Sequence, residues 1–151
     1  MPKEDQQDDT RLRAAIDKPH QLRLESEVTC LEECQTGEEE DAHFVVVAER
    51  RYPSLLLYEL KALENLNLGA TINPRMTLAG HENPITTIKS RMSSILSGNS
   101  SGEVLLHNLN KGLQATHFRY HRDQVNSCIW LGQARDTKTF ATGCEDGNIC
   151  M

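Results

Sequence analysis

The 151-residue chain lacks the features that define several large classes of protein. No apolar run approaches the roughly 20 residues that a membrane-spanning helix needs. The start, MPKEDQQDDTRLR, is charged and has no apolar segment of the kind found in secretory signals. The five cysteines are odd in number and irregularly spaced, so we interpret them as reduced thiols and not as a disulfide framework. We therefore expect no membrane association and a cytoplasmic and/or nuclear protein.

Motifs for catalysis and cofactor binding are also missing. The sequence contains no Gly-x-Ser-x-Gly and no His-Glu-x-x-His. The glycine-containing stretch 97–102 (SGNSSG) has no lysine and precedes a predicted strand, so it does not match a phosphate-binding loop. The sequence therefore predicts a protein without enzymatic activity and without a cofactor.

Negative charge is confined to one end of the chain. Residues 1–41 carry 13 acidic and 5 basic side chains, whereas residues 42–151 carry 9 and 11. A nucleic-acid-binding surface would need a concentrated basic face, so nucleic acid is an unfavoured partner. Residues 1–41 are predicted to form an acidic arm, and residues 1–27, with few and scattered large apolar side chains, are expected to be disordered. Within residues 28–41 the pattern allows a short strand followed by an acidic loop.

From residue 42 onwards the composition favours strands. The runs FVVVAE (44–49) and SLLLYEL (54–60) are separated by RRYP, in which Pro53 suits a turn, so they predict a β-hairpin. Residues 61–75 are rich in asparagine and contain glycine and proline, which predicts a linker. A short helix over 59–66 is the competing interpretation.

Two later segments, 80–109 and 120–151, are internal repeats. His81 corresponds to His121 at an offset of 40, and Gly102 corresponds to Gly147 at an offset of 45 after an insertion, GQARDTK (132–138). Each copy has an alternating strand after the histidine, a second strand ending in Ser/Thr-Gly, a turn that contains glycine, and a third apolar strand. The hairpin over 44–60 aligns with the back half of an earlier copy.

This pattern resembles the WD-repeat (WD40) family, in which a unit of roughly 40–45 residues forms one four-stranded blade of a β-propeller. The residues that carry the resemblance are Gly80, His81, Ser97, Gly98, Gly102, Val104 and Leu106 in the first copy, and His121, Val125, Trp130, Thr142, Gly143, Asp146, Gly147 and Ile149 in the second.

The repeats depart from the family pattern at several positions. His107 and Asn108 stand where the closing Trp-Asp pair is expected, Ser101 stands at the turn aspartate, and the second copy stops one residue before its expected tryptophan. The resemblance therefore implies an all-β fold: an incomplete propeller of two and a half to three blades, with portions near 42–60, 76–110 and 117–151. We interpret the chain as an N-terminal fragment with degenerate repeats, from a truncated product or a partial gene model.

In the WD-repeat family a histidine, a Ser/Thr hydroxyl, a turn aspartate and a tryptophan form a buried hydrogen-bond chain within one blade. By resemblance, His121, Thr142 and Asp146 match three of these positions, and His81 and Ser97 match two. We therefore expect both histidines to be architectural and not catalytic.

The resemblance also implies the function of a protein-interaction scaffold or adaptor. Such a scaffold could be a subunit of a multiprotein complex or a substrate receptor of a cullin-type ubiquitin ligase, with proteins or peptides as partners. The basic and aromatic stretch 117–122 (HFRYHR) falls between two blades, and we select Phe118, Arg119, Tyr120 and Arg122 as candidate contact residues.

Two alternatives from other classes rest on particular residues. A nucleic-acid-associated module would use the basic side chains of inter-blade loops, Arg119, Arg122, Arg135 and Lys138. A zinc enzyme would use Cys30, Cys34 and His43, for which no fourth ligand is evident nearby.

Overall fold

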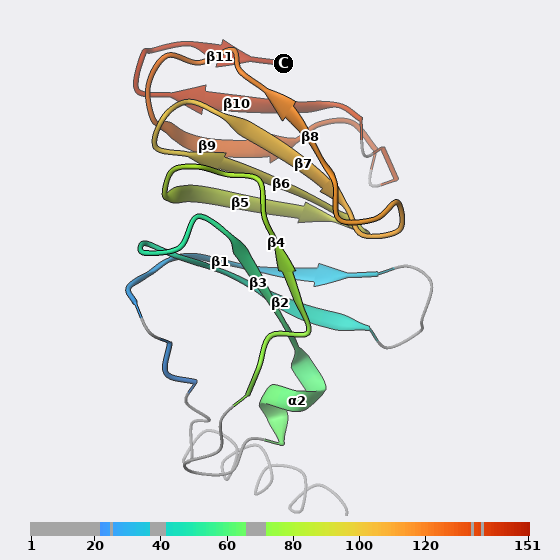
Figure 1. Cartoon of the computed structure of the whole chain (residues 1–151). Coiled ribbons are helices and arrows are strands. Elements are labelled where there is room, and N and C mark those ends of the chain that lie inside the picture. The colour runs from blue at the N-terminus through green and yellow to red at the C-terminus, as the bar shows by residue number, and fades with distance from the viewer. Residues whose placement is uncertain (1–21, 25, 37–41, 66–71, 134, 137) are drawn as a thin grey trace, which may run out of the picture.

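The computed structural model describes residues 22–24, 26–36, 42–65, 72–133, 135–136 and 138–151. In this part of the chain three antiparallel sheets lie face to face as a stack, with the first sheet at one end and the third at the other (Figure 1). The fold is therefore all-β, as the alternating runs and the repeat predicted. The disorder expected for residues 1–27 falls mostly on residues outside the described part.

The first sheet contains the predicted hairpin. Its order is β1 (Val28–Gln35), β2 (His43–Glu49), β3 (Leu55–Glu59) and β4 (Met76–Leu78). β1 confirms the short strand that the pattern allowed within residues 28–41, but it belongs to the sheet and not to an arm, so the first blade begins at residue 28 and not at 42. β1 belongs to the sheet because it pairs along its length with β2 while Cys34 is buried in the core.

The linker predicted over 61–75 contains a short helix, α2 (Leu60–Glu64). The competing interpretation, a short helix over 59–66, is therefore correct for residues 60–64. Among the described residues no helix is long and apolar enough to cross a membrane.

The second and third sheets are the two copies of the repeat. The second sheet has the order β5 (Ile85–Arg91), β6 (Ser94–Asn99), β7 (Val104–Asn108) and β8 (Ala115–Phe118). The third contains β9 (Val125–Trp130), β10 (Phe140–Cys144) and β11 (Ile149–Cys150). The insertion at 132–138 lies in the β9–β10 connection, where extra residues do not interrupt a strand.

The boundaries of the repeat in sequence differ from those of the sheets. β4 lies in the predicted portion 76–110 but pairs with β3 of the first sheet, and β8 pairs with β7 and extends into the predicted portion 117–151. Each sequence unit therefore starts with the outer strand of the preceding blade. Two four-stranded sheets and one three-stranded sheet make the incomplete propeller that the sequence predicted.

Apolar side chains fill both spaces between the sheets. The layer between the first two sheets includes Phe44, Val46, Leu55, Leu57, Leu78, Ile85 and Ile95. The layer between the second and third sheets includes Leu96, Val104, Val125, Cys128 and Trp130, with Phe118 and Phe140 packed against it. Because each sheet buries its face only against its neighbour, this burial supplies the main driving force that holds the blades together.

A threonine on each of the first two inner strands adds a hydrogen bond to the following blade. Thr29 Oγ1 donates to Ile85 O at 2.8 Å, and Thr86 Oγ1 donates to Val125 O. Ile85 and Val125 are equivalent residues of the repeat, so β1 holds the same place in its blade as β5. The repeat therefore extends to β1, although the two threonines are 57 residues apart.

Candidate functional site

His81, the first repeat histidine, is buried and hydrogen bonded at both ring nitrogens. Its Nε2 lies 2.8 Å from Ser97 Oγ on β6, and its Nδ1 lies 3.1 Å from Nδ2 of Asn99, the last residue of β6. The structure therefore brings together the two residues that the resemblance paired, and it adds an asparagine that the sequence analysis did not select.

The orientation of the Asn99 amide determines which nitrogen of His81 carries the proton. Asn99 Oδ1 accepts hydrogen bonds from the backbone N–H groups of Ser101 and Glu103, each at 3.0 Å. The amide nitrogen, which can only donate, therefore faces His81 Nδ1. His81 then carries its proton on Nε2 and donates it to Ser97 Oγ. Burial lowers the pKa of His81 to about 4, against the opposing effect of the Glu103 carboxylate, so the ring is neutral near pH 7.

We expect Asn99→Ala to lower the free energy of unfolding by about 1–3 kcal/mol, because it leaves one histidine nitrogen and two backbone N–H groups without their acceptor or donor. The matched control is Asn83→Ala, since this half-buried residue donates to Ser101 Oγ at 3.2 Å near the surface and its loss should cost less than about 0.5 kcal/mol. Urea unfolding of both variants measures the difference. Equal midpoints would contradict a structural role for Asn99.

Glu103 joins this network to the segment that leads into the third sheet. Its Oε1 accepts hydrogen bonds from His117 Nδ1 at 2.9 Å and from Arg119 Nε at 3.0 Å, and its Oε2 lies 3.4 Å from Asn99 Nδ2. Burial alone would raise the pKa of Glu103, but the hydrogen bonds from His117 and Arg119 outweigh it, so the pKa is lowered. The carboxylate stays ionised and ties Arg119 to the second blade.

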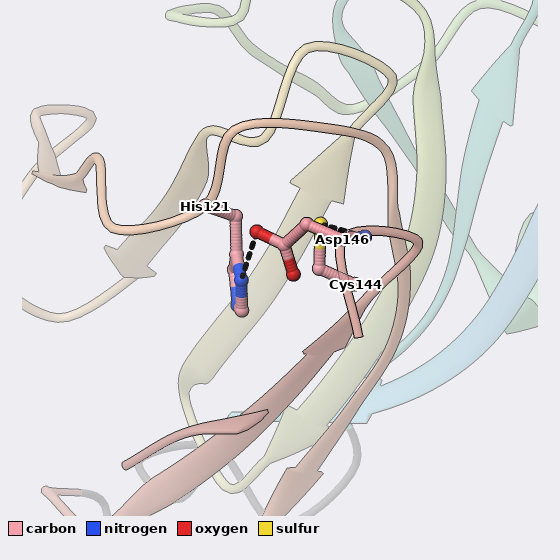
Figure 2. A group of neighbouring side chains, drawn as sticks. All are labelled: His121, Cys144 and Asp146. Atoms are coloured by element: carbon pink, nitrogen blue, oxygen red, sulfur yellow. Dashed lines mark hydrogen bonds and ion pairs between the residues drawn. The ribbon is translucent and has the colours of Figure 1, made fainter. Parts of the chain in front are cut away.

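The second repeat histidine, His121, is also buried, but its surroundings differ. Its Nε2 lies 2.8 Å from Thr142 Oγ1, and its Nδ1 lies 3.7 Å from Asp146 Oδ2 (Figure 2). The backbone N–H groups of Asn148 and Arg122 donate to the Asp146 carboxylate and hold the pKa of Asp146 well below its usual range. The three residues that the resemblance grouped in this blade therefore lie together.

The repeat glycines allow close approaches and tight turns. A Cβ on Gly98 would lie 2.6 Å from Val125 Cγ1, so the second and third blades meet closely there. Gly102 and Gly147 have φ of +92° and +82° and end equivalent turns between the second and third strands of their sheets. The remaining repeat glycines, Gly80 and Gly143, lie before His81 and on β10.

The four predicted contact residues divide into two pairs. Phe118 is the last residue of β8 and packs edge-on against Phe140, with ring centroids 5.2 Å apart. Arg119 donates a hydrogen bond to the buried carboxylate of Glu103, which lies in the β6–β7 turn. Tyr120 is 71% exposed and Arg122 is also exposed. Phe118 therefore packs between the blades, and Arg119 holds the β8–β9 connection to the second blade although its side chain is exposed, while Tyr120 and Arg122 are exposed and available to a partner.

A groove of about 390 Å³ lies beside Tyr120, between β7 and β8 of the second sheet and β10 and β11 of the third. Its walls are mainly apolar, with Lys138 and Thr139 towards the β9–β10 connection and Tyr120 and His121 towards the β8–β9 connection. The apolar lining consists of Val104, Leu106, Phe118, Phe140, Cys150 and Met151. The sequence analysis did not find this groove because its two walls come from different repeats.

The residues selected for the nucleic-acid and zinc-enzyme alternatives do not form compact clusters. Arg119 and Arg122 lie in the β8–β9 connection, whereas Arg135 and Lys138 lie in the β9–β10 connection, at the other end of the six-residue strand β9. That strand separates the two pairs by about 20 Å. The four basic residues therefore form two separate sites and not one basic face.

The predicted zinc residues are likewise apart. Cys30 and Cys34 are four positions apart on β1, which separates them by roughly 13 Å. Cys34 Sγ donates to Met92 O at 3.3 Å in the core, while His43 Nδ1 lies 3.1 Å from Glu33 Oε1. This arrangement does not hold a single metal ion.

Comparisons with known proteins show a likeness in fold. No family model matches the sequence, and no curated protein matches it. Among solved structures, the computationally designed Ika8 protein matches with a TM-score of 0.61 and 16% identity, over 83% of this chain and 33% of that chain. A chain in the mitotic checkpoint complex matches with a TM-score of 0.63 and 15% identity, over 85% and 36%.

The designed Ika4 protein gives a TM-score of 0.62 and 16% identity, over 84% of this chain and 66% of that chain. The chain thus spans about a third of the length of the first two chains that it matches. The stacked sheets and these likenesses together define a propeller-like fold.

Proposed function

We propose that this chain is part of a WD-repeat propeller that acts as a non-enzymatic scaffold, binding proteins or peptides at the groove beside Tyr120. The groove carries this proposal, because an apolar hollow with exposed aromatic and basic side chains at its ends is suited to a peptide. Both repeat histidines are engaged in buried hydrogen bonds, which supports an architectural role over a catalytic one. The five free thiols support a cytoplasmic and/or nuclear location.

The shape and charge of the groove suggest the chemistry of its partner. The groove runs along the five-residue strand β10, so an extended segment of about five residues matches its length. Apolar side chains of the partner would pack on Phe118 and Phe140, while acidic residues at its ends would face Arg122 and Lys138. A substrate receptor of a cullin-type ubiquitin ligase and a subunit of a multiprotein complex are two forms that such a scaffold could take.

The test compares partner capture by two double variants of the full chain. Tyr120→Ala/Arg122→Ala should reduce the capture of specific partners about tenfold or more, because exposed aromatic and arginine side chains dominate such interfaces. Lys111→Ala/Leu113→Ala is the control, since these exposed residues lie in the β7–β8 connection, at the other end of β8. Quantitative mass spectrometry of cross-linked cell extracts measures both.

Capture that is equally reduced or equally unchanged in the two double variants would contradict the proposed site. A DNA or RNA affinity that falls steeply with salt and depends on Arg119, Arg122, Arg135 and Lys138 would instead favour the nucleic-acid alternative.

A further inference from the structure

The two repeat histidines occupy equivalent positions but have different neighbours. The strand registers align Ser97 with Leu105 in the second sheet and Thr142 with Cys150 in the third, so the copies can be compared position by position. The three positions around the histidine carry Asn99, Ser101 and Leu105 in the second sheet, and Cys144, Asp146 and Cys150 in the third. At these three positions only the third sheet carries side chains that bind metal ions, although His81 also has one carboxylate nearby, with Glu103 Oε2 at 3.8 Å from its Nδ1.

The donor atoms of this cluster converge on one point. The ligand atoms of His121, Cys144 and Asp146 all lie within 4.8 Å of one another (Figure 2). His121 Nδ1 is 3.7 Å from Asp146 Oδ2 and 3.9 Å from the sulfur of a fourth residue, Cys150. Ligands of a tetrahedral zinc ion, with bonds of about 2.0–2.3 Å, lie about 3.3–3.8 Å apart. The two separations from His121 Nδ1 thus need to shorten by a few tenths of an ångström, and the other separations within the group, which reach up to 4.8 Å, by up to about 1–1.5 Å.

The groups around His121 also suit a metal ligand. His81 Nδ1 is satisfied by the Asn99 amide at 3.1 Å, whereas His121 Nδ1 faces a carboxylate and a thiol at distances longer than a strong hydrogen bond. The other nitrogen of His121, Nε2, lies 2.8 Å from Thr142 Oγ1. A histidine that binds metal through one nitrogen donates the proton on the other to an outer partner, and Thr142 can accept it.

We propose that His121, Cys144, Asp146 and Cys150 bind a single zinc ion that links the loop before β9 to the β10–β11 turn. Two thiols, an imidazole and a carboxylate make a donor set that favours zinc over the hard cations magnesium and calcium. His121 is buried while the two cysteines are partly exposed, so the ion can enter from solvent. On binding, both thiols release their protons to water, and Cys144 gives up the hydrogen bond that it donates to Asp123 O.

The site adjoins the proposed peptide groove, because His121 and Cys150 also line that groove and Arg122 N donates a hydrogen bond to Asp146. Its role is structural, because four protein ligands, from two connections and two strand ends, leave no open position for a substrate. This inference does not depend on the scaffold function.

The experiment measures zinc and cobalt binding by the full chain after removal of bound metal with a chelator. We expect one zinc ion for each chain by elemental analysis, and strong visible absorption with Co²⁺ that indicates tetrahedral thiolate ligation. Cys144→Ser and Cys150→Ser should each weaken binding by about tenfold or more. Cys30→Ser is the matched control, because this half-buried thiol lies outside the cluster and belongs to the sequence-based zinc hypothesis.

Cys144→Ser and Cys150→Ser keep side chains of similar shape and so guard against a simple loss of folding, whereas Asp146→Asn would remove the charged ligand together with one of the two oxygens that accept the backbone N–H groups of Arg122 and Asn148. Circular dichroism of each variant verifies that it is folded, and a zinc-dependent rise in melting temperature should occur in the native chain and in Cys30→Ser only. Folded native protein that retains no stoichiometric zinc would overturn the proposal. Equal weakening by Cys30→Ser and Cys144→Ser would overturn it as well.

Discussion

Gly102→Ala is expected to destabilise the protein by about 2–4 kcal/mol, the largest effect of any single methyl group discussed for this chain. A Cβ at this position would lie 2.6 Å from His121 O and 2.9 Å from Asp123 O, and these backbone atoms cannot move without shifting the loop that enters the third blade. The residue also has φ of +92°, a backbone conformation that residues other than glycine rarely adopt. The conformational strain and the steric collision therefore both lower the free energy of unfolding.

The repeat provides a control for this prediction. Gly147 occupies the equivalent turn with φ of +82°, but a Cβ there would meet nothing within 4 Å. Gly147→Ala should therefore cost only the conformational strain, about 1 kcal/mol. Denaturant unfolding of the two variants separates the cost of the strained backbone from the cost of the collision. If Gly102→Ala were no more destabilising than Gly147→Ala, the contact between the second-blade turn and the third-blade loop would not contribute to stability.

Acidification from pH 7 to pH 5 should lower the free energy of unfolding by about 2 kcal/mol through His81 alone. Burial lowers the pKa of His81 to about 4, whereas the unfolded chain protonates near the ordinary value of 6.5. Between these values the unfolded state binds more protons, so stability is full above about pH 6.5 and falls as the pH drops towards 4. His107 adds to the effect in the same direction, because burial lowers its pKa too.

The charged and titratable groups near His81 set the useful range of this experiment. The Glu103 carboxylate opposes the lowered pKa of His81, and His107 and His117 reinforce it. Because the pKa of Glu103 is itself lowered, its effect on stability appears only below about pH 4.5. Urea unfolding between pH 7 and pH 5 therefore isolates the histidines.

The control variant is His81→Gln, which keeps a polar side chain in the network and cannot titrate. Its stability should change less with pH than that of the native chain, by up to about 1.4 kcal/mol per pH unit. An identical pH dependence in both proteins would mean that His81 does not remain neutral in the folded state.

Much of the architecture could be predicted from the sequence because it depends on local patterns. The alternation in residues 44–60 and the turn residue Pro53 predicted the β2–β3 hairpin, since strand periodicity and turn chemistry are encoded within a few residues. The repeated spacing of His81 and His121 with Ser97 and Thr142 predicted which side chains would meet. Copies of one unit fold alike, and each histidine bonds to the hydroxyl of its own blade.

Other features required the tertiary structure because their partners come from different blades or different repeat units. β1 has no strong pattern of its own, and it is a strand because β2 pairs with it and the second blade covers Cys34. The groove exists only where Phe118 of the second blade meets Phe140 of the third.

The two histidine sites show the same division. The sequence by itself placed a histidine opposite a hydroxyl in each copy. The resemblance also placed Asp146 beside His121, but only the tertiary structure showed the other groups that face the second ring nitrogen: the amide of Asn99, fixed by backbone donors, at His81, and the thiols of Cys144 and Cys150 at His121. These neighbours are set by strand register and turn geometry, which bring together side chains that are up to 29 residues apart in the sequence.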